Sequence, residues 1–301
     1  AKGFLDRSKF DGKLGINDTN LVINLNGIID LGKDTPVYQV NGNLFACNFK
    51  ALGITKQNLF LSGDFDFDFK VKSFDDFTGT ALLRNTSLLH NDERLSFDSL
   101  YLSNVYVDAF KRKLTVQSNE INAQLEGNYS LVQVPDMMLG LLHNYFPAYI
   151  PAPRRKVETQ NLVFNIETKD ISPFISLLNI PVGGFDYSTI KGEIDVQQNI
   201  FNLETYVPAF TFNKVGFENV LLNSKSDFAQ LRLNGSIDNV RFNDSLSLPN
   251  TVFTVEAAND TGFISIQTSA SKTLKDARLN AHFKASTDGF NIKFDPSTLV
   301  V

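Results

Sequence analysis

The fold class is decided by residues 61–71, which read LSGDFDFDFKV. From Leu61 to Val71 every second residue is apolar or glycine, and the residues between them are serine, aspartate or lysine. A period of two is typical of a β-strand with one buried face and one solvated face. At ~3.3 Å per residue, this strand would be roughly 35 Å long.

The same alternation surrounds a recurring motif, in which a central glycine is separated by one residue from an apolar residue on each side. Glycine inside a strand removes a side chain and allows the sheet to bend or coil. The central glycines of six copies are Gly27, Gly42, Gly63, Gly127, Gly192 and Gly235. We therefore predict an all-β fold, with an elongated, curved antiparallel sheet that forms a half-open apolar groove and carries two short amphipathic helices.

The strand pattern divides the chain into three parts. It fills residues 20–133, breaks where prolines accumulate, and resumes at about residue 187. We expect groove repeats over 1–133, short helices and a connecting strand inserted over 134–182, and further groove repeats over 183–301. The three parts would form one continuous elongated domain.

Two short helices are expected within the interruption. Pro135 and Asp136 suit the first turn of a helix over 135–146, and Ser172-Pro173 suits the start of another over 172–180. The apolar stripe of the first helix would consist of Met138, Leu141, Leu142 and Tyr145. Both helices would either plug the groove or pack on its rim, and we favour packing.

Internal similarity supports a repetitive sheet. Residues 95–102, LSFDSLYL, resemble residues 215–222, VGFENVLL, and a looser copy starts at Leu246. Self-similarity in an all-strand chain indicates an elongated stack of repeats. The chain starts and stops within its pattern, so we expect it to be an internal segment of a longer protein.

Composition excludes several classes of protein. The chain has 301 residues, 27 Phe, no Trp and a net charge of −5, which argues against a nucleic-acid partner. No apolar run approaches the roughly 18 residues that cross a bilayer. The single cysteine, Cys47, permits no internal disulfide and is expected to be a structural thiol.

No constellation of catalytic or metal-binding residues is visible in the sequence. His90, His143 and His282 are far apart and lack a nearby cluster of ligands. There is no nucleophile elbow, phosphate-binding loop or dinucleotide fingerprint. We therefore expect a protein that is not an enzyme and that uses no metal and no cofactor.

We interpret two charged features as ordinary solvent-exposed surface and not as ligand-binding sites. The carboxylates of Asp64, Asp66 and Asp68 share one strand face, which is more typical of a solvated surface than of a calcium site. The basic cluster at 154–156 follows several prolines and is expected to be an exposed loop, with contact to lipid phosphate as the alternative.

Several short sequence segments resemble a recurring passage of TamB-like proteins, the long inner-membrane subunits of the translocation and assembly module. AsmA-like proteins share much of the same sequence pattern. The similarity covers roughly residues 60–301 and is clearest over 120–260. The phrases that carry it are QLEGNY (124–129), VPD (134–136), LLHNYFP (141–147), FNI (164–166), DISP (170–173), the glycine strand at Ile190, and FNDSLSLPN (242–250).

The resemblance implies a setting as well as a fold. TamB-like proteins are anchored in the inner membrane of Gram-negative bacteria, cross the periplasm as a half-open β groove, and meet an outer-membrane barrel of the Omp85 type. The family is implicated in phospholipid movement and outer-membrane assembly. The chain would then be periplasmic, and contacts with either membrane or with the barrel would be made by regions outside it.

The first functional hypothesis is a lipid conduit, in which phospholipid acyl chains lie along the apolar groove. Each methylene that leaves water gains about 0.8 kcal/mol, and no catalytic residue is needed. The expected lining residues are Phe65, Phe67, Phe69, Phe164, Ile166, Ile194, Phe212, Leu231, Leu233, Phe253, Ile266 and Phe283.

Other hypotheses use the same pattern differently. A scaffold would hold strands of outer-membrane protein clients on the open face or at the sheet edges. A closed β-sandwich would fill the apolar face with its own side chains, but it requires Greek-key crossovers that the sequence does not suggest. A carbohydrate-active enzyme is the least favoured, because the chain lacks Trp and paired carboxylates.

Overall fold

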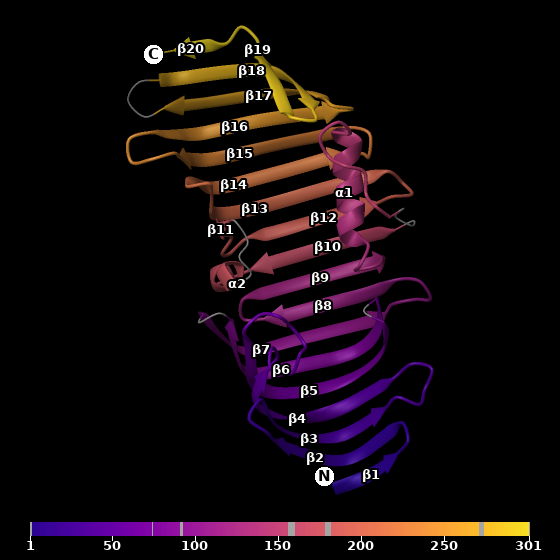
Figure 1. Ribbon diagram of the computed structural model, residues 1–301. Helices are drawn as coiled ribbons and strands as arrows, with labels where there is room; N and C mark the ends of the chain where they lie inside the picture. Colours follow the sequence, from indigo (N-terminus) through magenta and orange to yellow (C-terminus); the bar gives the residue numbers. More distant parts are fainter. Residues whose placement is uncertain are drawn as a thin grey trace. The chain divides into compact units, whose positions relative to one another are not determined.

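The computed structural model describes residues 2–73, 75–90, 93–155, 160–177, 182–270 and 274–300. Its strands form one antiparallel sheet of twenty strands, from β1 (Lys2–Asp6) to β20 (Thr298–Val300), in which most strands pair with their neighbours in the chain (Figure 1). No described ladder joins the first strand to the last ones, so the sheet is open. The predicted all-β fold class is confirmed.

The chain falls into two compact units. Unit 1 comprises Ala1–Leu125 and Pro173–Asn179, and unit 2 comprises Glu126–Ser172 and Ile180–Val301. The three-part organisation expected from the sequence stays a prediction.

Unit 1 contains the N-terminal strands, each hydrogen-bonded to the next. After β1 they are β2 (Lys9–Asn17), β3 (Leu21–Asp30), β4 (Val37–Asn48), β5 (Leu59–Ser73), β6 (Asp76–His90), β7 (Glu93–Tyr106), β8 (Arg112–Ser118) and the first part of β9 (Ile121–Asn128). The long strands of this unit curve along their length (Figure 1).

Unit 2 contains the remaining strands and the longer helix, α1 (Val134–Tyr145). Its strands before β20 are β10 (Asn161–Thr168), β11 (Gly183–Gly184), β12 (Thr189–Asp195), β13 (Ile200–Phe212), β14 (Val215–Ser226), β15 (Leu231–Arg241), β16 (Ser247–Ala258), β17 (Thr261–Ala270), β18 (Leu274–Ser286) and β19 (Gly289–Phe294). The short β11 pairs with β13, and β10 pairs directly with β12. Among the described helices, none is long and apolar enough to span a bilayer.

Strand β5 has the two faces that its sequence predicts. Phe65, Phe67 and Phe69 are half-buried on one face, with successive ring centroids 5.2 and 5.4 Å apart. Asp66 and Asp68 on the other face are exposed. We call this Phe-bearing face the inner face of unit 1, and we call the face that carries the buried cluster Val207, Val220, Ile237 and Val240 the inner face of unit 2.

The motif glycines interlock across neighbouring strands. Gly27 lies opposite Val40, and Gly42 lies opposite Leu25, so a glycine faces an apolar residue on the next strand. Gly27 has φ +142°, and a Cβ atom there would run into the backbone of β4. In unit 2 the neighbouring side chains cover the glycines, because aromatic rings from adjacent strands lie over Gly192, Gly235 and Gly262.

The inner face of unit 2 changes phase within its long strands. On β14, Phe217 and Val220 both join the buried core although they are three residues apart, which strict alternation does not allow. Between them Asn219 adopts φ +49°. The same three-residue step separates Ile237 from Val240 on the neighbouring strand.

These phase steps form a row across the sheet, at cross-strand positions Pro208, Asn219, Asp238 and Asn250, where the ladders skip a pair. Asn250 also has positive φ, +51°. On the outer face Asn219 Nδ2 donates to Asp238 Oδ2 at 2.9 Å. In the repeated sequence phrase at residues 215–222, the apolar residues of β14 therefore change from odd to even numbering.

Helix α1 lies across the strands of unit 2 (Figure 1). Met137, Leu141 and Tyr145 are its buried residues, at i, i+4 and i+8. The predicted stripe is correct for Leu141 and Tyr145 and wrong for Leu142, which is 42% exposed. The buried face of the helix therefore follows Met137, Leu141 and Tyr145, because residues four apart on a helix lie above one another.

The C-terminal end of α1 is fixed to the hairpin turns of unit 2. The Tyr145 hydroxyl donates to the carbonyl oxygen of Asp227 at 2.7 Å, and the Asp260 N–H donates to the Tyr145 carbonyl at 2.9 Å. Beyond the helix, Phe146 and Tyr149 place their rings 5.5 and 5.0 Å from Phe290. These contacts join the helix to two turns and to the first part of β19, and they agree with packing at the rim.

The second helix, α2, spans Ser172–Leu177, and the remainder of the predicted range, 178–180, lies outside the described residues. The Ser172 hydroxyl donates to Asp186 at 2.5 Å. Phe174 places its ring 6.3 Å from Phe97, which lies on the inner face of unit 1 opposite Thr86. This helix therefore contributes an aromatic residue to the inner face of unit 1.

Candidate apolar groove

A pocket opens on the inner face of unit 1, where β3, β4, β5 and β6 lie side by side. Its volume is about 230 Å³. The residues that line it are Ile23, Leu25, Val40, Leu44, Leu61, Ser62, Gly63, Phe65, Phe67, Leu83 and Thr86.

Glycines lie opposite larger residues at this pocket. Leu44 on β4 pairs with Gly63 on β5, and Phe65 pairs with Gly42. A Cβ atom at Gly63 would lie 2.7 Å from Thr86 Oγ1 and 3.0 Å from the Arg84 carbonyl oxygen, so β5 and β6 approach too closely there for a larger side chain. The glycine therefore adds no side chain that could fill the pocket.

The lining offers hydrocarbon contact and no charge. None of the lining residues is Asp, Glu, Lys, Arg or His. The Thr86 hydroxyl donates to the Arg84 carbonyl of its own strand at 3.3 Å, so its bonding capacity is used locally. An apolar surface without titratable groups favours binding through burial of hydrocarbon.

The outer face behind the pocket is polar and bonded to itself. Asp64 accepts hydrogen bonds from Asn43 Nδ2 at 2.6 Å and from Asn85 Nδ2 at 3.0 Å. These bonds, first that of Asn85 and then that of Asn43, hold the pKa of the Asp64 carboxyl below its usual value. Asp68 accepts a bond from Gln39 at 3.2 Å. Asp66 and Asp68 are exposed, as expected for a solvated surface, and the hydrogen bonds along the row were not foreseen from the sequence.

Two of the twelve predicted lining residues, Phe65 and Phe67, line this pocket. Phe69 continues the same face and packs against Tyr38, with ring centroids 5.4 Å apart. That these side chains contact lipid stays a prediction.

The other nine predicted residues belong to unit 2, where several are engaged by the protein's own side chains. Phe253 packs on the buried cluster formed by Val207, Val220, Ile237 and Val240. Ile194 is only 2% exposed. The remaining placements by cross-strand partner are Phe164 opposite Gly192, Ile166 opposite Ile190, Leu231 opposite Ala257, Leu233 opposite Val255, and Ile266 opposite Phe253.

Phe283 and Phe212 mark two margins of unit 2. Phe283 lies opposite Gly262 and within 6.2 Å of the Phe146 ring, so it belongs to the aromatic contact below the end of α1. Phe212 is at the last position of β13 and is 47% exposed. The structure therefore does not bring the twelve predicted residues together in one pocket.

The sequence interpretation missed most of the residues that line the pocket. The missed apolar residues are Ile23, Leu25, Val40, Leu44, Leu61 and Leu83. Four of them, Leu25, Val40, Leu44 and Leu61, are the apolar positions of the glycine motif itself. The motif was therefore a better guide to the pocket than the bulk of individual Phe residues.

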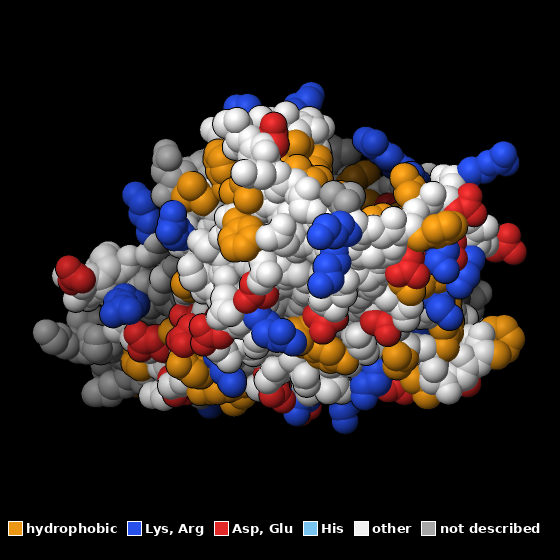
Figure 2. Space-filling view, turned by 90° about the horizontal axis from the view of Figure 1, so that it is seen from below, with side chains coloured by type: hydrophobic (Ala, Val, Ile, Leu, Met, Phe, Trp, Pro, Cys, Tyr) orange, Lys and Arg blue, Asp and Glu red, His pale blue; other side chains and the backbone are white. Residues whose placement is uncertain are grey.

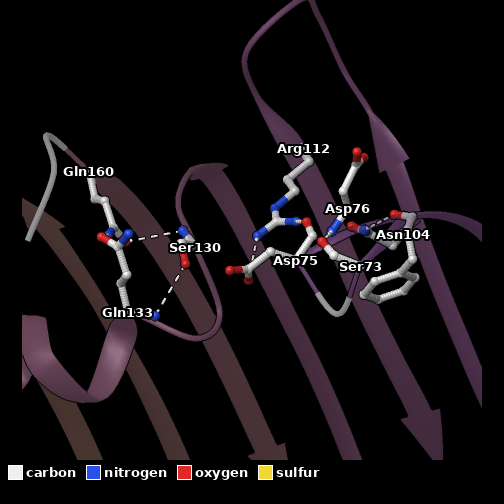
Figure 3. Close-up of polar contacts among 9 residues, drawn as sticks. Ser73, Asp75, Asp76, Asn104, Arg112, Ser130, Gln133 and Gln160 are labelled. Carbon is white, nitrogen blue, oxygen red and sulfur yellow. Dashed lines mark hydrogen bonds and ion pairs between the residues drawn. The ribbon is translucent and has the colours of Figure 1, made fainter. Parts of the chain in front are cut away.

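Buried polar groups also escaped the sequence interpretation (Figure 3). In unit 1, Arg112 is 5% exposed, and its guanidinium donates to the Asp75 carbonyl and lies 3.8 Å from the Asp75 carboxylate. Asn104 is 1% exposed and donates to the Phe77 carbonyl at 2.5 Å. Both residues follow the inner-face register, so this end of the apolar face is polar.

A second polar group in Figure 3 belongs to unit 2 and holds the start of α1. Gln160 accepts the Ser130 N–H at 3.1 Å and donates to Gln133 Oε1 at 2.9 Å. Gln133 N–H in turn lies 3.2 Å from Ser130 Oγ. These bonds satisfy backbone donors just before the helix and have a structural role.

Metal and thiol chemistry receive no support within the part of the chain that the structure describes. No group of three or more His, Cys, Asp or Glu residues there is placed to hold a metal ion. His143 Nδ1 lies 2.7 Å from the Ile150 carbonyl oxygen, and His282 lies 3.4 Å from Asp295. Burial raises the pKa of the Cys47 thiol, as expected for a structural cysteine.

Charged side chains of both signs are interspersed on the face shown in Figure 2, with hydrophobic side chains between them. This distribution agrees with the composition of the chain, which has 28 basic and 33 acidic residues. A mixed surface of this kind gives no broad field to attract a polyanion.

Comparisons with known proteins found no match. No protein-family model, no curated protein and no solved structure matches the chain.

Proposed function

We propose that the chain binds hydrocarbon chains of amphipathic lipids on the inner face of its sheet, with the pocket of unit 1 as the binding site. The observation that carries the proposal is an open pocket of about 230 Å³ with no charged side chain in its lining. Exposed apolar grooves on natural proteins are frequently ligand-binding sites. The role proposed is binding without catalysis and without a cofactor.

The pocket volume sets how much of a lipid it holds. An apolar cavity of about 150 Å³ is sufficient for benzene, so 230 Å³ corresponds to about nine carbon atoms. At ~0.8 kcal/mol per methylene, their burial contributes about 7 kcal/mol before the cost of ordering the chain. One pocket would thus hold part of an acyl chain, and the polar head group would stay in water.

The wider setting is proposed from the family resemblance. The chain would be a periplasmic segment of a TamB-like, inner-membrane-anchored protein that carries phospholipid toward an Omp85-type barrel, with the barrel contacted by regions outside this chain. Support for this setting comes from the open antiparallel sheet with recurring glycines, which is the architecture that the resemblance implies.

The proposal is tested with two neighbouring residues of β4, one in the pocket lining and one outside it. Leu44 lines the pocket, whereas Phe45 is 58% exposed. Leu44→Glu places a carboxylate in the pocket and Leu44→Trp fills it, so both variants should bind cis-parinaric acid at least tenfold more weakly. Phe45→Glu should bind like the original chain, because its side chain leaves the lining unchanged.

Lipid extraction and mass spectrometry of the purified chain provide the second measurement. Co-purified phospholipid that is lost in Leu44→Trp supports the proposal. If all three variants bind cis-parinaric acid equally, the pocket is not the site. A chain that carries no lipid and instead protects unfolded outer-membrane strands from aggregation would support the alternative role as a client scaffold.

A further inference from the structure

The loop between β4 and β5, residues 49–58, presents apolar side chains to solvent. Leu52 is 40% exposed and Ile54 is 64% exposed. At the adjoining ends of the two strands, Phe45 and Phe60 are 58% and 41% exposed. We call these four residues the loop patch. Exposed apolar side chains that gather at one end of two paired strands are candidates for contact with another molecule.

The backbone of the loop holds these side chains outward. The Leu52 N–H donates to the Asn48 carbonyl at 3.1 Å, and the Ile54 N–H donates to the Phe49 carbonyl at 2.9 Å. Between them Gly53 has φ +73°, and no atom lies within 4 Å of the position that a Cβ would take. The loop is therefore a hydrogen-bonded turn with an open space around its tip.

The charged residues of the loop itself are both lysines. Between residues 35 and 63 the only charged side chains are Lys50 and Lys56, in a chain whose net charge is −5. Lys50 Nζ donates to Asn58 Oδ1 at 2.8 Å, across the base of the loop. Asp18 is the acidic residue of the adjacent β2–β3 turn, and its carboxylate accepts the Asn20 N–H at 2.9 Å.

Apolar side chains flanked by lysines fit the surface of a bilayer better than they fit another protein. The apolar side chains enter the boundary between head groups and acyl chains, while lysines reach anionic phosphates on their long stems. Each lysine near an anionic surface adds to this attraction, and added salt weakens it. Protein–protein interfaces, in contrast, are depleted in lysine.

The position of the loop connects it to the pocket. It joins β4 and β5, the two strands that contribute Val40, Leu44, Leu61, Phe65 and Phe67 to the lining. Leu61 follows the loop by three residues. A bilayer in contact with the loop would therefore lie beside an apolar pocket.

We propose that residues 49–58 dock the chain onto bilayers that contain anionic phospholipid. The benefit of this contact rests on the proposed function, because docking places the pocket next to a source of acyl chains. The contact itself is measured separately from lipid binding. The family resemblance assigns membrane contacts to regions outside this chain. The loop would be an additional membrane-facing surface within the chain.

The test is co-flotation of the 301-residue chain with vesicles of phosphatidylcholine and phosphatidylglycerol, and with vesicles of phosphatidylcholine alone. The chain should float with the mixed vesicles, and added salt should release it. The double variant Leu52→Asp, Ile54→Asp should bind at least tenfold more weakly. The matched control is Leu31→Asp, because Leu31 is 54% exposed in the turn at the other end of β4 and should float like the original chain.

Each outcome assigns the failure to one proposal. Equal flotation of the double variant and the control overturns the docking proposal, and so does a chain that binds neither kind of vesicle, as would follow if the patch served a protein partner. Binding of cis-parinaric acid without vesicles should be unchanged in the double variant, which also shows that the variant is folded. Docking without cis-parinaric acid binding would overturn the proposed function and leave the membrane contact standing.

Discussion

The seating of α1 on unit 2 leads to a quantitative prediction for two adjacent leucines. Leu141 is 1% exposed and Leu142 is 42% exposed, although both belong to the same helix. Leu→Ala removes three carbon atoms, worth about 2.4 kcal/mol of transfer free energy when fully buried, and the cavity left behind raises the cost to ~3–5 kcal/mol. We expect Leu141→Ala to lower the free energy of unfolding by about 3 kcal/mol and Leu142→Ala by about 1 kcal/mol or less.

The comparison isolates packing because both substitutions change helix propensity by the same few tenths of a kcal/mol. Urea unfolding followed by circular dichroism gives the free energies. Hydrogen exchange with mass spectrometry then locates the change, since loss of seating in Leu141→Ala should reduce amide protection in α1 and in the Asp260 turn that bonds Tyr145.

Two results would refute this reasoning in different ways. Equal destabilisation by the two substitutions would mean that the helix is not held by the face centred on Met137 and Leu141. An increase in cis-parinaric acid binding by Leu141→Ala would mean that α1 occupies a hydrocarbon site, which is the plug alternative, and is not simply packed at the rim.

Three further predictions concern backbone and charge. Gly140→Ala should stabilise the fold by ~0.5–1 kcal/mol and raise the melting temperature, because alanine favours helix and the nearest atom to the new Cβ is Pro153 Cγ at 3.6 Å. An unchanged or lower melting temperature would contradict this. Gly27→Ala should cost ~2–4 kcal/mol in urea unfolding, because its Cβ would meet the backbone of β4, whereas Gly53→Ala should cost only about 1 kcal/mol for its positive φ; equal losses would contradict the close approach. The pKa of Asp64 is lower in the folded chain than in the unfolded one, so its stabilisation is present above about pH 4 and is lost as the pH falls through the folded value; Asp64→Asn should flatten acid unfolding there, and an unaltered curve would count against the asparagine bonds.

The sheet was predictable because its signal is repeated and local. In β5, the period of two assigns Phe65 and Phe67 to one face and Asp66 and Asp68 to the other, and the structure confirms this arrangement. Burial of one face alone produces that pattern, so no knowledge of the neighbouring strands is needed.

The phase steps were not predictable from the same rule. Asn219 with φ +49° looks in sequence like any polar residue on an outer face. Its effect is to place Phe217 and Val220 on one face, which breaks the period of two. The similarity of residues 95–102 and 215–222 was visible, but its physical meaning depends on a backbone conformation that composition does not specify.

The pocket could not be predicted from single strands, because its lining depends on the register in which neighbouring strands pair. Gly63 and Leu44, which are 19 positions apart in the sequence, both line the pocket because the register of β4 and β5 places them opposite each other. Strand pairing is set by the turns and by the two faces together, so a list of bulky residues such as Phe212 and Phe283 selects apolar strand positions without showing which of them meet. The phase of α1 was misjudged for a similar reason, because Leu142 and Leu141 are equally apolar and only the sheet decides between them.

The pairing of strands with their neighbours in the chain has a consequence for folding during synthesis. Since strands pair mainly with their neighbours in the chain, each can join the sheet soon after it leaves the ribosome, without waiting for distant sequence. At every moment of synthesis, however, the newest strand exposes a fresh row of unpaired amides and carbonyls. The nascent protein thus always has an exposed edge strand that can pair with another chain, and its risk of aggregation depends on how quickly the next strand is synthesised and covers that edge.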